Sequence, residues 1–233
     1  MVQKSSLKKV VVIVGPTGVG KTKISIKLAK KYNFTIASHA EDNYYKYARE
    51  GEYVAVLREI ELAKKIGCKY HFCHMSVKES FDAIRKAQQE GYTNITCEVA
   101  PHHLVLNKDM IKDANYKMNP PLREESDRLE TIKALLDGTA CMIASDHAPH
   151  SEEEKSQEYD KCPNGIIGIE TMIPIIYTEF VKKGLITFDR FLDILVNKNR
   201  SLGKDNKSGD WFYKNEAFDR EFDERADRNQ YKF

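Results

Sequence analysis

Residues 70–76 have the sequence Tyr70-His71-Phe72-Cys73-His74-Met75-Ser76, in which a short apolar and aromatic run ends at a histidine. Such a run predicts a buried β-strand. The same arrangement recurs at residues 34–38, which are followed by His39, and at residues 142–145, which are followed by Asp146. Amphipathic helical patterns separate these runs. This alternation is typical of parallel α/β proteins.

The whole chain of 233 residues follows this alternation. The expected strands are residues 10–14, 34–38, 70–73, 94–99 and 142–145, and the expected helices are residues 21–31, 52–65, 78–90, 126–136, 168–182 and 188–196. A closed (β/α)₈ barrel needs eight strands and about 250 residues. Five strands therefore predict an α/β fold in the form of a partial TIM-type barrel with parallel strands.

His39, His74 and Asp146 each follow a predicted strand directly. In parallel barrels the active site is built at the carboxyl ends of the strands. Neutral imidazoles and a carboxylate are suitable zinc ligands. A single histidine at a strand end is more often structural, but three ligand-type residues at equivalent strand ends favour a metal site.

Five motifs in this part of the chain occur in an order that resembles a known family. They are Ser38-His39-Ala40-Glu41-Asp42-Asn43, Tyr70-His71-Phe72-Cys73-His74-Met75-Ser76, Glu98-Val99-Ala100-Pro101-His102-His103-Leu104, Lys117-Met118-Asn119-Pro120-Pro121-Leu122-Arg123 and Ala144-Ser145-Asp146-His147-Ala148-Pro149-His150. Together they resemble the second half of bacterial class I dihydroorotases, which are metal-dependent amidohydrolases. The resemblance covers about residues 34–200.

The resemblance implies a set of roles. His39 and His74 would hold zinc, and Asp146 would be both a metal-linked carboxylate and the general acid/base. The substrate-binding residues would be Asn119, His150, Asn164 and Gly165. The implied reaction is the reversible hydrolysis of dihydroorotate to N-carbamoyl-aspartate, in which the metal activates water and polarises the cyclic amide carbonyl.

The remaining histidines and the strand cysteines carry weaker expectations. His71 is expected to pack rather than to bind a metal. A structural or supporting role is expected for His102 and His103, and His147 could orient Asp146. Two cysteines, Cys73 and Cys141, are expected to be inert small hydrophobic residues within strands.

The N-terminal region carries a different motif. Residues 15–22, Gly15-Pro16-Thr17-Gly18-Val19-Gly20-Lys21-Thr22, match the phosphate-loop pattern between a predicted strand and a predicted helix. In that pattern the backbone around Gly15, Gly18 and Gly20 wraps phosphates, Lys21 reaches the β and γ phosphates, and Thr22 meets Mg²⁺. Residues 8–33 resemble the opening of tRNA dimethylallyltransferase. Binding of Mg-ATP by a protein of that type is therefore an alternative function.

These patterns divide the chain into residues 1–33, a P-loop-like βα unit; residues 34–200, a dihydroorotase-like half barrel; and residues 201–233, a charged tail. No histidine precedes His39, so the His-x-His pair that opens the dihydroorotase pattern is absent. We therefore expect one zinc ion at most, and either a homo-oligomer or a partner chain that completes the barrel. A non-functional mosaic of the two families is a further alternative.

Composition excludes several classes of protein. Hydrophobic residues make up 41% and charged residues 31% of the chain, a balance typical of globular proteins. The net charge of +2 argues against a surface for nucleic acid, and no apolar run is long enough to cross a membrane. Five cysteines without a CxxC pair favour reduced thiols. A cytoplasmic protein that acts on a small molecule is the expectation.

Overall fold

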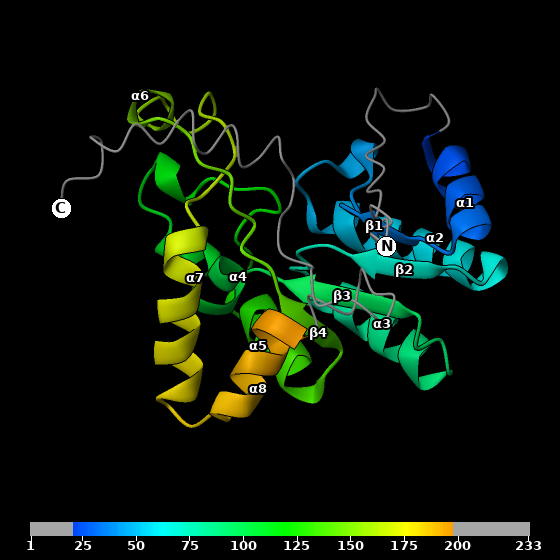
Figure 1. Cartoon of the computed structure of the whole chain (residues 1–233). Coiled ribbons are helices and arrows are strands. Elements are labelled where there is room, and N and C mark those ends of the chain that lie inside the picture. Colours follow the sequence, from blue (N-terminus) through cyan, green and yellow to red (C-terminus); the bar gives the residue numbers. More distant parts are fainter. Residues whose placement is uncertain (1–20, 198–233) are drawn as a thin grey trace, which may run out of the picture.

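Four parallel strands form one sheet in the computed structural model, which describes residues 21–197. They are β1 (Thr35–Ser38), β2 (Lys69–Phe72), β3 (Ile95–Val99) and β4 (Ala140–Ile143). Their order in the sheet, β1-β2-β3-β4, follows the chain without reversal (Figure 1). Sequential order is the winding of a (β/α) barrel, whereas a doubly wound sheet reverses direction at a switch point. The predicted parallel α/β fold is confirmed.

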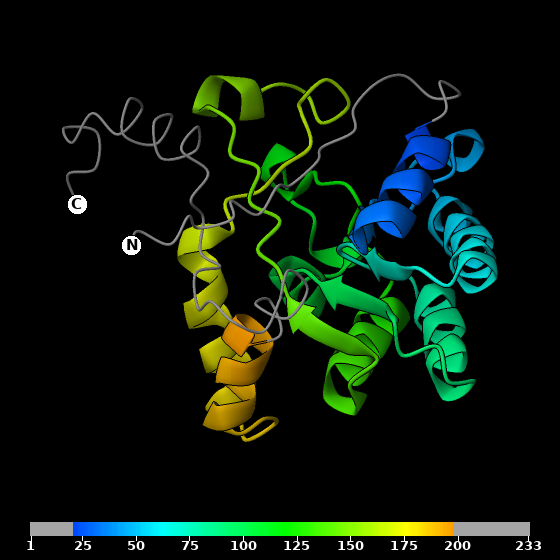
Figure 2. The ribbon, with the colours of Figure 1, turned by 45° about the vertical axis from the view of Figure 1, so that its right-hand side comes forward.

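Three helices form a layer along one side of the sheet: α2 (Arg49–Ile66), α3 (Lys78–Gln89) and α5 (Glu125–Asp137) (Figures 1 and 2). Helix α1 (Lys21–Tyr32) lies beside β1, whereas α7 (Ile169–Ile176) and α8 (Phe188–Leu192) lie toward β4. The shorter elements are α4 (Pro101–Val105), α6 (Glu152–Lys155), the 3₁₀ turns Asn43–Tyr45, Lys108–Met110 and Ala114–Tyr116, and the π-helical turns Tyr177–Val181 and Asp193–Asn197.

The main core lies between the sheet and this helix layer. In β3, Ile95, Cys97 and Val99 are fully buried, since alternate residues of a strand point to the same face. The inner face predicted for α2 is confirmed, because Val56, Ile60 and Ala63 are buried against the sheet. Other members of the core are Phe72, Phe81, Ile84, Ala87, Ala134 and Leu135.

The opposite face of the sheet is more polar. His71 of β2 pairs in register with Thr96 of β3, and both alternate with the apolar residues of the core. Glu98 follows on the same face of β3 and Cys73 on the same face as His71. The sheet therefore separates an apolar helix-facing side from a side that carries titratable groups.

Element boundaries agree closely with the sequence-based expectations. Four of the five predicted strands are observed, and the fifth, residues 10–14, lies outside the described residues. Strand β4 begins and ends two residues earlier than predicted. It ends at Ile143 because the residue that pairs with Ile143, Val99, is the last residue of β3. The predicted helix 168–182 is observed as α7 followed by a π-helical turn.

No helix between residues 21 and 197 combines the length and the apolar character needed to cross a membrane. The tail proposed for residues 201–233 lies outside the described residues, as does most of the phosphate-loop unit. The domain boundaries near residues 33 and 200 stay predictions.

Candidate active site

Polar side chains gather at the carboxyl edge of the sheet, where each strand ends and is followed by a loop or a short helix. His39 follows β1, His74 follows β2, and Asp146 follows β4. After β3, helix α4 begins at Pro101, with Ala100 as its N-cap, and contributes His102 and His103 to the same edge. This edge is where parallel barrels assemble their catalytic groups.

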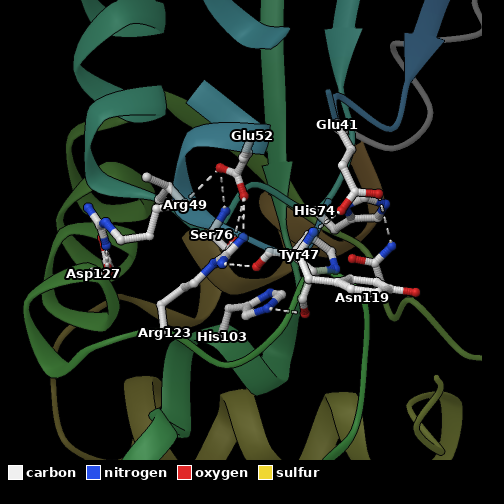
Figure 3. Close-up of polar contacts among 12 residues, drawn as sticks. Glu41, Tyr47, Arg49, Glu52, His74, Ser76, His103, Asn119, Arg123 and Asp127 are labelled. Atoms are coloured by element: carbon white, nitrogen blue, oxygen red, sulfur yellow. Dashed lines mark hydrogen bonds and ion pairs between the residues drawn. The ribbon is translucent and has the colours of Figure 1, made fainter. Parts of the chain in front are cut away.

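His39 and His74 are in direct contact. Nδ1 of His39 lies 3.0 Å from Nε2 of His74, and the two ring centroids are 4.7 Å apart. On the other side of the His39 ring, Nε2 lies 3.3 Å from Nδ2 of Asn119. The Oε2 atom of Glu41 lies 3.5 Å from both His39 Nε2 and Asn119 Nδ2. Figure 3 shows Glu41, His74 and Asn119 gathered on one side of the site.

His74 has an uncommon backbone conformation and a half-buried side chain. Its φ is 40°, an uncommon value for a residue with a side chain. Burial lowers its pKa, with only partial compensation from Asp146. Its Nδ1 is buried and has no hydrogen-bond partner within the described residues. A neutral imidazole with an unpartnered nitrogen is competent as a metal ligand.

Asp146 lies at the same edge but contacts a different histidine. Its Oδ2 is 3.8 Å from Nε2 of His102. Burial raises the pKa of the Asp146 carboxyl, and nearby Glu98 raises it further, whereas His74 and His39 lower it. Within the described residues, His39, His74 and Asp146 are not a group whose ligand atoms all lie within 4.8 Å of one another. The structure therefore pairs two of the three predicted ligands and places the third nearby.

His102 and His103 are both buried, as expected for supporting residues. Burial lowers the pKa of His102 to about 3 and that of His103 well below its usual value. The ring of His103 donates from Nε2 to the carbonyl oxygen of Pro120 at 3.1 Å, which ties α4 to the loop that carries Asn119. Both imidazoles are neutral at pH 7.

We expect His102 to make stability depend on pH. The folded pKa is below the unfolded value of about 6.5, so the unfolded state alone takes up a proton as the pH falls. The contribution of His102 to the free energy of unfolding is fully present above about pH 6.5 and is lost as the pH falls toward 3. Between pH 7 and pH 5 the free energy of unfolding should fall by roughly 2 kcal/mol. Urea unfolding at several pH values should show a shallower dependence in His102→Gln than in the wild type. Equal slopes in the two proteins would contradict the buried neutral state.

The other predicted substrate-binding residues lie around one loop junction. His150 donates from Nε2 to the carbonyl oxygen of Asn164 at 3.0 Å. Gly165 has a φ of 154°, and a Cβ there would lie 2.2 Å from the carbonyl oxygen of Ala148, so only glycine fits. An open pocket of about 510 Å³ lies beside this junction. It is lined by Leu106, Asp113, Asn115, Tyr116, Ala148, His150, Lys155, Gly165, Ile166 and Ile167.

Tyr47 connects this junction to the histidine pair and was not singled out from the sequence. Its backbone N–H donates to Oε1 of Glu41 at 2.8 Å, and its hydroxyl oxygen lies 3.3 Å from Nδ2 of Asn164. Its carbonyl oxygen accepts from Arg123 at 2.9 Å. With a φ of 65°, Tyr47 has a conformation that no sequence pattern around it would indicate.

Lys155 is a second residue that sequence reasoning missed. Its ammonium group donates to three carbonyl oxygens, those of Lys117 at 3.2 Å, Pro163 at 3.2 Å and Gly165 at 3.0 Å. Burial lowers its pKa. Because Lys155 lies in an acidic, mostly exposed stretch, its sequence context suggested only a surface loop. In the structure it fixes the loop that forms one wall of the pocket.

His147 has a different contact from the one expected. Its Nδ1 accepts from the backbone N–H groups of Gly168 at 3.1 Å and Ile169 at 3.3 Å, at the start of α7. An acceptor at this position satisfies donors that a helix start leaves free. These hydrogen bonds of His147 thus serve α7 and not Asp146.

The phosphate-loop residues Gly15, Gly18 and Gly20 lie outside the described residues. Lys21 and Thr22 are the first residues of α1, which agrees with the helix expected after the loop. Binding of Mg-ATP there stays a prediction from the sequence motif alone.

Comparison with known proteins finds relatives that match about three quarters of the chain. No protein-family model matches the chain. A dihydroorotase of Bacillus thuringiensis (strain Al Hakam) is 43% identical over 194 residues, which cover 75% of this chain and 45% of that protein. A dihydroorotase of Staphylococcus aureus (strain N315) is 44% identical over 190 residues, which cover 73% of this chain and 45% of that protein. The chain therefore spans less than half the length of these curated relatives.

Solved structures give the same picture of the fold. A dihydropyrimidinase from Brevibacillus agri NCHU1002 superposes with a TM-score of 0.66 at 28% identity, over 73% of this chain and 43% of that one. An L-hydantoinase from Arthrobacter aurescens superposes with a TM-score of 0.71 at 25% identity, over 78% of this chain and 46% of that chain. A dihydroorotase from Saccharomyces cerevisiae superposes with a TM-score of 0.71 at 16% identity, over 83% of this chain and 56% of that chain. At this identity the likeness is one of fold alone.

Proposed function

We propose, on the premise that this chain carries a dihydroorotase-like region of the amidohydrolase type, that it acts as a cyclic amidohydrolase on dihydroorotate. The observation that carries the proposal is the His39–His74 pair at the carboxyl edge of a parallel sheet, with Asn119 and Asp146 at the same edge. The reaction is the reversible hydrolysis of the ring amide to N-carbamoyl-aspartate. Because the chain spans less than half of its relatives, the activity is a proposal.

The residues present fit a metal ion at the histidine pair. Two imidazoles present nitrogens 3.0 Å apart, close to the ligand-to-ligand edge of about 3.3 Å in a tetrahedral zinc site. Nδ1 of His74 has no hydrogen-bond partner within the described residues, so no protein group fixes the tautomer that would leave Nε2 free for a metal ion. A zinc ion held by His39 and His74 would supply a Lewis acid for the amide carbonyl and would favour ionisation of water.

The chain's own groups account for proton transfer and orientation. Asp146 would accept a proton from the attacking water as the new C–O bond forms, and would return it to the ring nitrogen as the C–N bond breaks. Asn119 would orient the substrate with its amide beside His39. The imidazole of His150 and the backbone of Asn164 and Gly165 would contact the substrate at the pocket. Lys155 keeps that backbone in place.

The full chain loaded with zinc tests this proposal through two measurements, bound zinc and the rate of dihydroorotate hydrolysis. We expect His39→Ala to lose about one bound zinc per chain relative to the wild type, and its turnover to fall at least about 100-fold. Lys161→Ala is the matched surface control, since the Lys161 side chain is 70% exposed. Stoichiometric zinc without any turnover in the wild type would contradict the proposed activity.

A further inference from the structure

Three ligand-type side chains form a second cluster on the polar face of the sheet. They are His71, Cys73 and Glu98, whose ligand atoms all lie within 4.8 Å of one another. His71 and Cys73 are two residues apart and therefore share a face. Because Tyr70, His71 and Phe72 pair with Ile95, Thr96 and Cys97, the next position of this register sets Cys73 level with Glu98. Strand pairing therefore preorganises the cluster.

The hydrogen bonds of His71 indicate which ring nitrogen carries its proton. Nδ1 lies 2.9 Å from the hydroxyl oxygen of Thr96. That hydroxyl donates its own hydrogen to the carbonyl oxygen of Tyr70 at 3.3 Å, so it accepts from His71. This arrangement suits the tautomer with its proton on Nδ1, in which the lone pair of Nε2 is free for another partner.

That lone pair points at a carboxylate. Nε2 of His71 lies 3.1 Å from Oε2 of Glu98, and the His71 side chain is 2% exposed. Two lone pairs at this distance repel each other unless a proton or a metal ion lies between them. The site thus has a built position for a cation, with the thiol of Cys73 beside it.

We propose that His71, Cys73 and Glu98 form a thiolate-containing site for a zinc-class divalent cation, separate from the His39–His74 pair. Zinc takes Cys sulfur at about 2.3 Å, His nitrogen at about 2.0 Å and carboxylate oxygen at about 2.1 Å, so a tetrahedral site has N···O edges of about 3.3 Å. The observed separation of 3.1 Å is close to this edge. One sulfur, one nitrogen and one oxygen donor are a set that zinc and cobalt accept.

Cobalt titration of the full chain tests the site, because Co²⁺ replaces zinc and a cobalt–thiolate bond has a near-ultraviolet charge-transfer band. We expect this band in the wild type and its loss on addition of zinc. Cys73→Ser should abolish the band, and Glu98→Gln should weaken cobalt binding by about 100-fold or more, since even residues that only support a ligand contribute 10–100-fold. Circular dichroism establishes that each variant is folded.

Two further variants test whether the band arises at this cluster. Cys68→Ser is the matched thiol control, because Cys68 is a thiol at the other end of β2 and lies outside the cluster, and it should keep the band. His39→Ala removes the proposed catalytic pair and should also keep the band, whether or not the protein hydrolyses dihydroorotate. The proposal is overturned if the wild type shows no band, or if the band survives in Cys73→Ser.

Discussion

Asp146→Asn is expected to lower kcat for dihydroorotate hydrolysis by about a thousand-fold, within the range of 10²–10⁴ that general acid–base groups contribute. Asparagine keeps the size of the side chain but cannot accept or return a proton. Zinc bound at His39 and His74 should remain, because Asp146 contacts His102 and not the histidine pair. The measurement is steady-state kinetics on zinc-loaded protein, with the zinc content determined on the same sample.

The pH profile distinguishes proton transfer from a merely structural role of Asp146. The group works as a base, so activity should fall as the pH drops through its pKa. Burial raises that pKa above the ordinary aspartate value, so the acid limb of kcat/KM should lie above about pH 4. The residual activity of Asp146→Asn should lack this limb. A variant with near wild-type kcat, or with the same acid limb, would rule out Asp146 as the base.

Much of the fold follows from local patterns in the sequence. Period-two alternation marks β3, and helical periodicity marks the inner face of α2, where Val56, Ile60 and Ala63 are buried as expected. The strand ends then place His39, His74 and Asp146 at one edge of the sheet. These predictions succeed because they depend on spacing within single elements, and on the rule that parallel strands end together.

The rest of the site depends on pairings that no local pattern contains. The His71–Cys73–Glu98 cluster needs the register between β2 and β3, and from the sequence His71 was expected only to pack. Tyr47 reaches Asn164, which is 117 residues away in the chain. Such contacts are decided by tertiary geometry, so a sequence without structural information cannot separate these residues from others of the same type.

The sequence also does not indicate that Glu52 contributes to stability. Its position in the first turn of α2 suggests an ordinary surface acid. In the structure it is 3% exposed. Its Oε1 accepts from the backbone N–H groups of Ser76 at 3.1 Å and Val77 at 2.9 Å, and its Oε2 accepts from the Ser76 hydroxyl at 2.5 Å. Figure 3 shows Glu52 and Ser76 beside Arg123 in this network. The carboxylate therefore joins α2 to the loop between β2 and α3.

Glu52→Ala should lower the free energy of unfolding by roughly 3–5 kcal/mol, the range for removing one partner of a buried ionic network. Two backbone donors would lose their acceptor. The guanidinium of Arg123, 3.8 Å from the carboxylate, would remain partly buried without its counter-charge. Glu52→Gln should lower stability less, by roughly 1–3 kcal/mol, because the amide oxygen still accepts. Urea unfolding followed by far-ultraviolet circular dichroism gives these values.

Glu50→Ala is the matched control for this effect. Glu50 lies in the same turn of α2 and has the same carboxylate, but it is exposed. Its removal should change stability by less than about 0.5 kcal/mol, as for ordinary surface substitutions. Similar losses in Glu50→Ala and Glu52→Ala would mean that the helix start needs acidic residues in general. A loss confined to Glu52→Ala, with Glu52→Gln between it and the wild type, would locate the stabilisation in the buried network that holds Ser76 and Val77.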